Sequence, residues 1–279
     1  MGKKTKRAAQ PRNLTTSHDI DRWLDRAVQQ LIAADYAGVI ATVQRVLRAP
    51  VAAQAQRVEA LHRLGAAYSM LDQHDKCYAA VSEALTLTPN DPMLWYNRGM
   101  AGRFMLQLGQ SLRDFERAVE LDTEGLIAER LAEDLPFARS AVATELALRG
   151  PDFTLDQLIA QEALFDEAAA MMGQHRWAEA EALFCQVIAM SDGLPQPQGN
   201  LGLCLLMQRR FDEAEAALRR ALKIDPNYAI ARQNLAGLPA IRASGKLPEM
   251  RVNNPLKDRQ GKKTLSLLVE GEKQFRNLS

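Results

Sequence analysis

Residues 195–228 read PQPQGNLGLCLLMQRRFDEAEAALRRALKIDPNY, and this stretch decides the fold. Two apolar runs with helical spacing flank Arg209-Arg210. Asp225-Pro226-Asn227 closes the stretch, because proline disfavours helix in the residue before it. The sequence therefore predicts a helical hairpin. Because a lone hairpin cannot bury its apolar faces, it must stack on copies of itself.

Copies of this unit recur along the chain at an interval of 34 residues. Aligned positions carry similar residues, and Trp177-Ala178-Glu179-Ala180 falls under Phe211-Asp212-Glu213-Ala214. A constant period of this length indicates a repeat architecture. The clear copies are residues 58–91, 92–125, 161–194 and 195–228.

The repeated pattern resembles the tetratricopeptide repeat, in which W-x2-L-G-x2-Y is followed by A-x3-F and then by proline. The four clear copies cover about half of the chain. The resemblance implies an all-α fold, a right-handed superhelical solenoid of helix-turn-helix repeats. It is specific for the fold and says little about a partner, because the matching residues are packing residues. Among these, Gly65, Gly99 and Gly202 are expected where the two helices of a hairpin cross closely.

A weaker repeat is predicted at residues 20–53, with Trp23 at the tryptophan position and a first helix capped by Ser17 or Asp19. Residues 51–57 are then a lengthened turn or an extension of the next helix. Together these repeats form an N-terminal array over residues 20–125.

Residues 126–160 do not match the motif and are predicted to form a divergent helical hairpin. Its first helix ends at Pro136 and its second at Gly150-Pro151. A flexible joint between two arrays is the alternative. Thr154 with Gln157 predicts a capping box for the helix that follows.

The C-terminal array covers residues 161–241, in repeats 161–194 and 195–228 and a capping helix that Pro239 cuts short. Residues 1–17 are predicted to be a basic disordered tail, and residues 242–279 a basic tail with a short helix within 263–276.

Charge is unevenly distributed along the chain. Residues 1–15 carry +5 and residues 242–279 carry +5, so the total of +1 leaves −9 for residues 16–241. Basic tails can contact a nucleic acid, a ribosome or another acidic surface. Solvated termini without a partner are the alternative reading, which is favoured because neither tail interleaves aromatic residues for base stacking.

Composition limits the class of protein. The chain is 47% apolar and 25% charged, as in ordinary globular proteins, and no apolar run reaches the ~18 residues that a membrane span needs. Its three widely spaced cysteines are typical of a reduced, cytoplasmic protein. No phosphate loop, zinc motif or nucleophile motif occurs, so no catalytic residue, metal site or cofactor is predicted.

The resemblance also implies a binding site, because the first helices of successive repeats line a concave groove that binds peptides in this family. Transferring the family's groove positions to 161–172 and 195–207 also gives Glu162, Asp166, Met172 and Gln196. The family's asparagines at the sixth repeat position hydrogen-bond the peptide backbone, and Asn97, Asn200 and Asn234 occupy it here. The predicted groove residues are Met93, Tyr96, Asn97, Met100, Arg103, Phe104, Phe165, Asn200, Leu203, Met207 and Asn234.

The sequence therefore predicts a non-enzymatic scaffold that binds a peptide segment of a protein partner in the groove. A packing role for these residues, against the C-terminal segment of the chain, is left open. The alternative function is an RNA- or ribosome-associated adaptor that uses the two basic tails.

Overall fold

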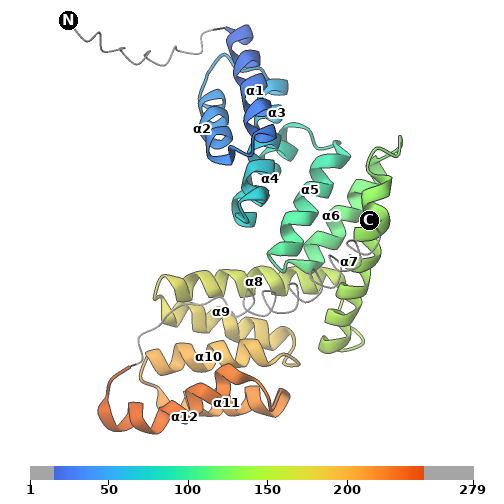
Figure 1. Ribbon diagram of the computed structural model, residues 1–279. Helices are drawn as coiled ribbons and strands as arrows, with labels where there is room; N and C mark the ends of the chain where they lie inside the picture. Colours follow the sequence, from blue (N-terminus) through green and yellow to red (C-terminus); the bar gives the residue numbers. More distant parts are fainter. Residues whose placement is uncertain (1–15, 248–279) are drawn as a thin grey trace, which may run out of the picture. The chain divides into compact units, whose positions relative to one another are not determined.

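Figure 1 shows the computed structural model, which describes residues 16–247. Every regular element in that part of the chain is a helix, which confirms the predicted all-α helical-repeat fold class. The chain divides into two compact units, each described by itself below. Unit 1 comprises the residues up to Met105 and Arg113–Leu135, and unit 2 comprises Leu106–Leu112 and the residues from Pro136 on.

From residue 17 to residue 104, unit 1 is built from consecutive antiparallel helices that pack each on the next. Its core includes Ile20, Leu61, Val81 and Leu94, each with at most 1% of its surface exposed. The unit contains the beginning of α7 (Ala128–Arg149), the greater part of α6 (Leu108–Leu121), α1 (Ser17–Ile32), α2 (Tyr36–Leu47), α3 (Gln54–Met70), α4 (His74–Leu87) and α5 (Pro92–Phe104).

Unit 2 repeats the same arrangement, and Figure 1 shows its helices in a row from α8 to α12. Phe184, Cys204 and Leu218 are fully buried between the hairpins. The unit contains the start of α6, the end of α7, α8 (Leu155–Gly173), α9 (Trp177–Met190), α10 (Pro195–Met207), α11 (Phe211–Ile224) and α12 (Ala229–Ser244).

The turn within each hairpin has one residue in the left-handed conformation, two positions after the first helix ends and two before the second begins. The following amide closes the turn, as when Gln73 N–H donates to the Tyr68 carbonyl at 2.9 Å and Arg210 N–H to the Leu205 carbonyl at 3.0 Å. None of the five residues is glycine: they are Ala34 (φ 55°), Asp72 (55°), Leu106 (67°), His175 (59°) and Arg209 (63°).

Glycine is required where the two helices of a hairpin cross. A Cβ at Gly202 would lie 2.7 Å from Leu218 Cγ, and a Cβ at Gly65 would lie 2.9 Å from Val81 Cγ2. Real Cβ atoms do not approach that closely, so a side chain at these two positions would push the helices apart. The prediction of close crossings is confirmed at Gly65 and Gly202.

Two prolines predicted to end helices do not do so. One helix, α7, runs through Pro136 where two helices were predicted, and α12 continues through Pro239 to Ser244. Both proline side chains are exposed. Proline's φ of about −65° fits a helix, so an exposed proline can cost one backbone hydrogen bond without ending the helix. The predicted hairpin at 126–160 is thus a single helix followed by the start of α8.

The helix starts agree in part with the sequence prediction. Thr154 and Gln157 form the predicted capping box, since Gln157 N–H donates to Thr154 Oγ1 at 3.2 Å. The cap of α1 is Thr16, paired with Asp19, and Ser17 is the first helical residue, so the predicted Ser17 or Asp19 cap was wrong. Residues 54–57 extend α3. The predictions for residues 1–15 and 248–279 lie outside the described part of the chain.

Replacing Gly202 with leucine should lower the free energy of unfolding by about 1–3 kcal/mol, because the new side chain overlaps Leu218 at the crossing. The denaturation midpoint of the full chain measures this. Gly173→Leu is the matched control, because nothing lies within 4 Å of a Cβ at that position. Equal midpoints for the two variants would show that the crossing tolerates a side chain.

Glycine at a left-handed turn position should stabilise the hairpin by about 0.5–1 kcal/mol, because it removes the Cβ penalty of a positive φ. Asp72 is suitable, since its side chain is 96% exposed and its φ is 55°. We expect Asp72→Gly to raise the thermal midpoint. Asp72→Ala keeps a Cβ and should leave the midpoint unchanged. A gain with alanine instead would place the effect in the aspartate side chain.

Candidate functional site

The predicted groove residues divide between the units. Met93, Tyr96, Asn97, Met100, Arg103 and Phe104 lie on α5 in unit 1, and Phe165, Asn200, Leu203, Met207 and Asn234 lie in unit 2.

Within unit 1, Asp134 on α7 binds two of the predicted residues. Tyr96 is 8% exposed, and its hydroxyl donates to Asp134 Oδ2 at 2.7 Å. Arg103 Nη1 donates to Asp134 Oδ1 at 2.6 Å. The Tyr96 ring also contacts Phe115, with centroids 5.6 Å apart. Tyr96 is therefore a packing residue, and its replacement would test stability more than binding.

Two more residues of this set contact histidines of unit 1. Asn97 Nδ2 lies 3.0 Å from His62 Nε2, and the Phe104 ring stacks on His74 with centroids 4.4 Å apart. Burial lowers the pKa of His62. A peptide bound along this face would have to compete with these contacts.

The predicted residues of unit 2 are mostly covered. Asn200 is 3% exposed, so it is not the surface asparagine that the sequence suggested. Leu203 and Met207 pack against the core as half-buried side chains, and Asn234 on α12 is also half-buried. Phe165 packs edge-on against Phe184 at 5.5 Å and also lines a cavity.

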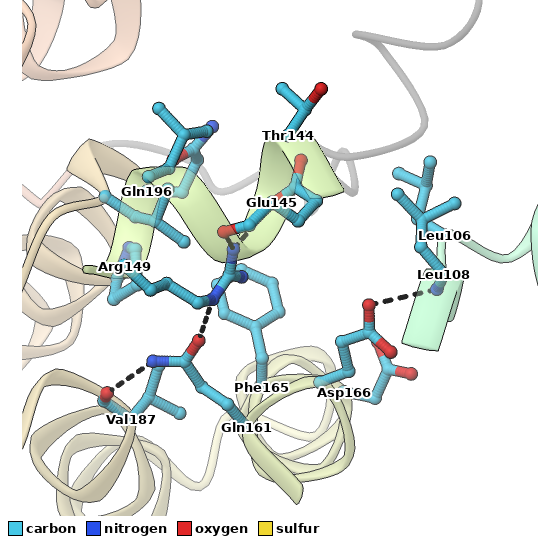
Figure 2. Close-up of a pocket in the computed structure, with 14 residues that line it drawn as sticks. Leu106, Leu108, Thr144, Glu145, Arg149, Gln161, Phe165, Asp166, Val187 and Gln196 are labelled. Atoms are coloured by element: carbon cyan, nitrogen blue, oxygen red, sulfur yellow. Dashed lines mark hydrogen bonds and ion pairs between the residues drawn. The ribbon is translucent and has the colours of Figure 1, made fainter. Parts of the chain in front are cut away.

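That cavity lies within unit 2 and has a volume of about 380 Å³ (Figure 2). Its position brings together Phe165 with Glu162, Asp166 and Gln196, all groove positions implied by the resemblance. Most of its wall is apolar, and one end carries carboxylates. Its lining residues are Leu106, Leu108, Thr144, Glu145, Leu148, Arg149, Gln161, Glu162, Phe165, Asp166, Val187, Leu194, Gln196 and Pro197.

Arg149, from the last turn of α7, is the cation of the cavity, and its own helix and α8 hold it. Its side chain is 6% exposed. Nη1 donates to Glu145 Oε2 at 2.7 Å, and Nε donates to Gln161 Oε1 at 2.5 Å. Gln161 in turn donates to the Val187 carbonyl at 2.9 Å. Figure 2 shows this chain of contacts along one wall.

Glu162 on α8 accepts hydrogen bonds from the first amides of α6. Leu108 N–H donates to its Oε1 at 2.9 Å, and Gly109 N–H to its Oε2 at 3.1 Å. The close approach needs glycine, since a Cβ at Gly109 would lie 2.8 Å from Ile159 Cγ1. Burial raises the pKa of Glu162 to about 8, although the two amides act to lower it.

Asp166 lies one helical turn beyond Glu162 and accepts from Gln107 Nε2 at 2.8 Å. Burial raises its pKa as well. The two carboxyl groups therefore lie in a poorly solvated place where no cation of the cavity fully offsets the loss of water. A ligand that supplied a positive charge here would stabilise their ionised forms.

Gln196, in the first turn of α10, has an unsatisfied acceptor. The residue is 7% exposed, and its Oε1 is buried without a hydrogen-bond partner. A buried acceptor in that state costs about 1–3 kcal/mol. A peptide N–H that entered the cavity would satisfy it.

Sequence reasoning missed the α7 side of the cavity, which includes Thr144, Glu145, Leu148 and Arg149. These residues belong to the segment that does not match the repeat pattern, so no repeat position pointed to them. Arg149 directly before Gly150-Pro151 was the available signal, as a cation in the last turn of a helix.

Nothing else in residues 16–247 indicates reactive chemistry. No three His, Cys, Asp or Glu side chains of that range come together as metal ligands. The thiols of Cys77 and Cys204 are buried, and burial raises their pKa values to about 11 and about 12. Within the same range no helix is long and apolar enough to cross a membrane.

The fold and the cavity define a helical-repeat protein, and comparison with known families agrees. Residues 196–228 match the model of the tetratricopeptide repeat. The chain therefore contains a tetratricopeptide repeat in unit 2, which confirms the resemblance seen in its sequence. None of the curated proteins compared with the chain matches it.

Solved structures of tetratricopeptide proteins are similar to the chain at low identity. MamA is 17% identical over 73% of this chain and 96% of its own, with a TM-score of 0.37. YrrB, described as a tetratricopeptide protein with an unusual peptide-binding site, is 17% identical over 76% of this chain and 89% of its own, with a TM-score of 0.34. The TPR2AB domain of yeast Sti1, in a complex with pHSP90, is 14% identical over 80% of this chain and 84% of its own, with a TM-score of 0.39. At these TM-scores the likenesses carry no conclusion about a partner.

Glu162 should make stability depend on pH. Its folded pKa of about 8 exceeds the ordinary 4.5, so its contribution is full below pH 4.5 and is lost as pH rises through 8. We expect the free energy of unfolding of the native chain to fall relative to Glu162→Gln over this window. The slope is at most about 1.4 kcal/mol per pH unit.

Glutamine at 162 still offers an oxygen to the amides of α6 but does not titrate. Glu167→Gln is the control, since Glu167 is exposed on the same helix. Denaturant titrations at pH 5, 6, 7 and 8 measure the difference. A difference in the free energy of unfolding between the native chain and Glu162→Gln that does not change with pH would contradict the prediction.

Proposed function

We propose that the chain is a non-catalytic scaffold, and that the cavity of unit 2 binds a peptide segment of a protein partner. The observation that carries this is the combination of an apolar cavity of about 380 Å³ with the unpartnered Gln196 Oε1. Both features suit an extended peptide, whose apolar side chains can fill a pocket and whose backbone amides can donate to an acceptor.

The chemistry of the cavity suggests which peptide fits. Leu106, Leu148 and Pro197 offer an apolar surface, of which Leu148 is 51% exposed. Glu162 and Asp166 lie at the same cavity, while Arg149 is already bound to Glu145 and Gln161. We expect the bound segment to place a leucine-sized side chain in the cavity and a lysine or arginine near the carboxylates.

The adaptor alternative has no such support. Its basic tails lie mostly outside the described residues, and the one cation that lines the described cavity, Arg149, is already bound to Glu145 and Gln161. Nucleic-acid binding therefore remains only a prediction from the sequence. The same holds for cytoplasmic location and for the lack of catalysis.

Selection of displayed random peptides against the full chain tests the function. Enriched peptides should carry the apolar and basic pattern, and Leu148→Asp should weaken their binding by about tenfold or more, because it places a charge on the apolar wall. Ile224→Asp is the matched control, since Ile224 is 37% exposed in unit 2 and does not line the cavity. Peptides that bind all three chains equally would place the site elsewhere.

A further inference from the structure

The cavity of unit 2 lies within reach of a segment of the same chain that has the chemistry it requires. Residues 262–269 read KKTLSLLV, two lysines followed by an apolar cluster. We propose that this segment occupies the cavity in the absence of a partner and so regulates access to it. The inference rests on the proposed function, because it assigns a competitor to the same site.

Charge and apolar content match on the two sides. Lys262 and Lys263 would place positive charge beside the carboxyl groups of Glu162 and Asp166. Leucines just after the lysines can reach the apolar wall, since successive residues of an extended chain are separated by roughly 3.3 Å. The backbone amides of the segment can donate to Gln196 Oε1, which has no partner among the described residues.

The chain leaves its last described helix at a defined point in unit 2. Gly245 ends α12 with a φ of 66°, and its Cβ position lies 3.8 Å from Arg209 Nη1. Leu247, two residues on, packs against the core of unit 2. The tether therefore begins beside the turn between α10 and α11.

The distance from that point to the cavity fits the tether. Gln196 lies at the opposite end of α10, whose 13 residues span roughly 20 Å. A random-coil chain with as many residues as separate Leu247 from Lys262 has a root-mean-square length of roughly 21 Å. A tether whose mean length matches its span gives an effective concentration on the order of millimolar. Even a weak segment would then fill the cavity ahead of a dilute partner.

Disulfide trapping in the full chain tests the contact directly. Leu148→Cys is paired with Leu268→Cys, and Cys185→Ser removes the exposed native thiol. Ile224→Cys with Leu268→Cys is the matched control, because Ile224 ends α11 at a similar distance from the same turn and lies outside the cavity. We expect intramolecular cross-linking at Leu148 to be about tenfold faster, measured by mass spectrometry. Equal rates would overturn the proposal.

Competition separates this inference from the proposed function. A labelled synthetic peptide of residues 260–271 is titrated against the native chain and against Leu267→Asp with Leu268→Asp in the full chain. We expect the variant to bind it about tenfold more tightly, because the internal competitor is weakened. Leu148→Asp added to that variant should remove the gain.

Each other outcome has a definite meaning. Equal affinity for both chains, sensitive to Leu148→Asp, would reject occupancy by residues 262–269 and leave the peptide site standing. Binding to neither chain, or binding that Leu148→Asp does not change, would reject both the internal contact and a site of this chemistry.

Discussion

The structure depends on the close crossing of two short helices within each hairpin. Gly202 lets α10 approach α11 until Leu218 fills the space where a side chain would be, and Gly65 does the same against Val81. A hairpin closed in this way still exposes apolar faces on both sides. The next hairpin must therefore cover them, which extends the core along each unit.

The site arises where this regularity is interrupted. Helix α7 occupies the place of a hairpin, and its last turn brings Glu145, Leu148 and Arg149 to α8. Next to them Glu162 caps the start of α6, at a raised pKa of about 8. The end of α7 does not follow the repeat pattern and leaves a cavity beside the regular helices of unit 2. The cavity holds partly desolvated carboxyl groups and an unpartnered glutamine oxygen. The features on which the proposed peptide site rests thus lie where the packing is least repetitive.

Much of the fold could be predicted because the same residue pattern recurs in each repeat and indicates the same helical hairpin each time. The hairpins, the glycines at two crossings and the Thr154 capping box follow from residues within one period. Pro136 and Pro239 misled, because a proline on the exposed face of a helix that is packed on its other side costs one hydrogen bond and leaves the helix intact. The groove residues were less predictable, since a sixth-position asparagine can be buried, as Asn200 is at 3% exposed.

The sequence by itself determined the helical hairpins, their period and their apolar faces, because these depend on contacts between residues near one another in the chain. Only the tertiary structure decided that Tyr96 and Arg103 bind Asp134, and that Arg149 meets Gln161 at a cavity with Gln196. Those contacts join helices that carry no common pattern. Which side chains meet there depends on how the helices pack on one another, and the repeat period of the sequence does not specify that packing.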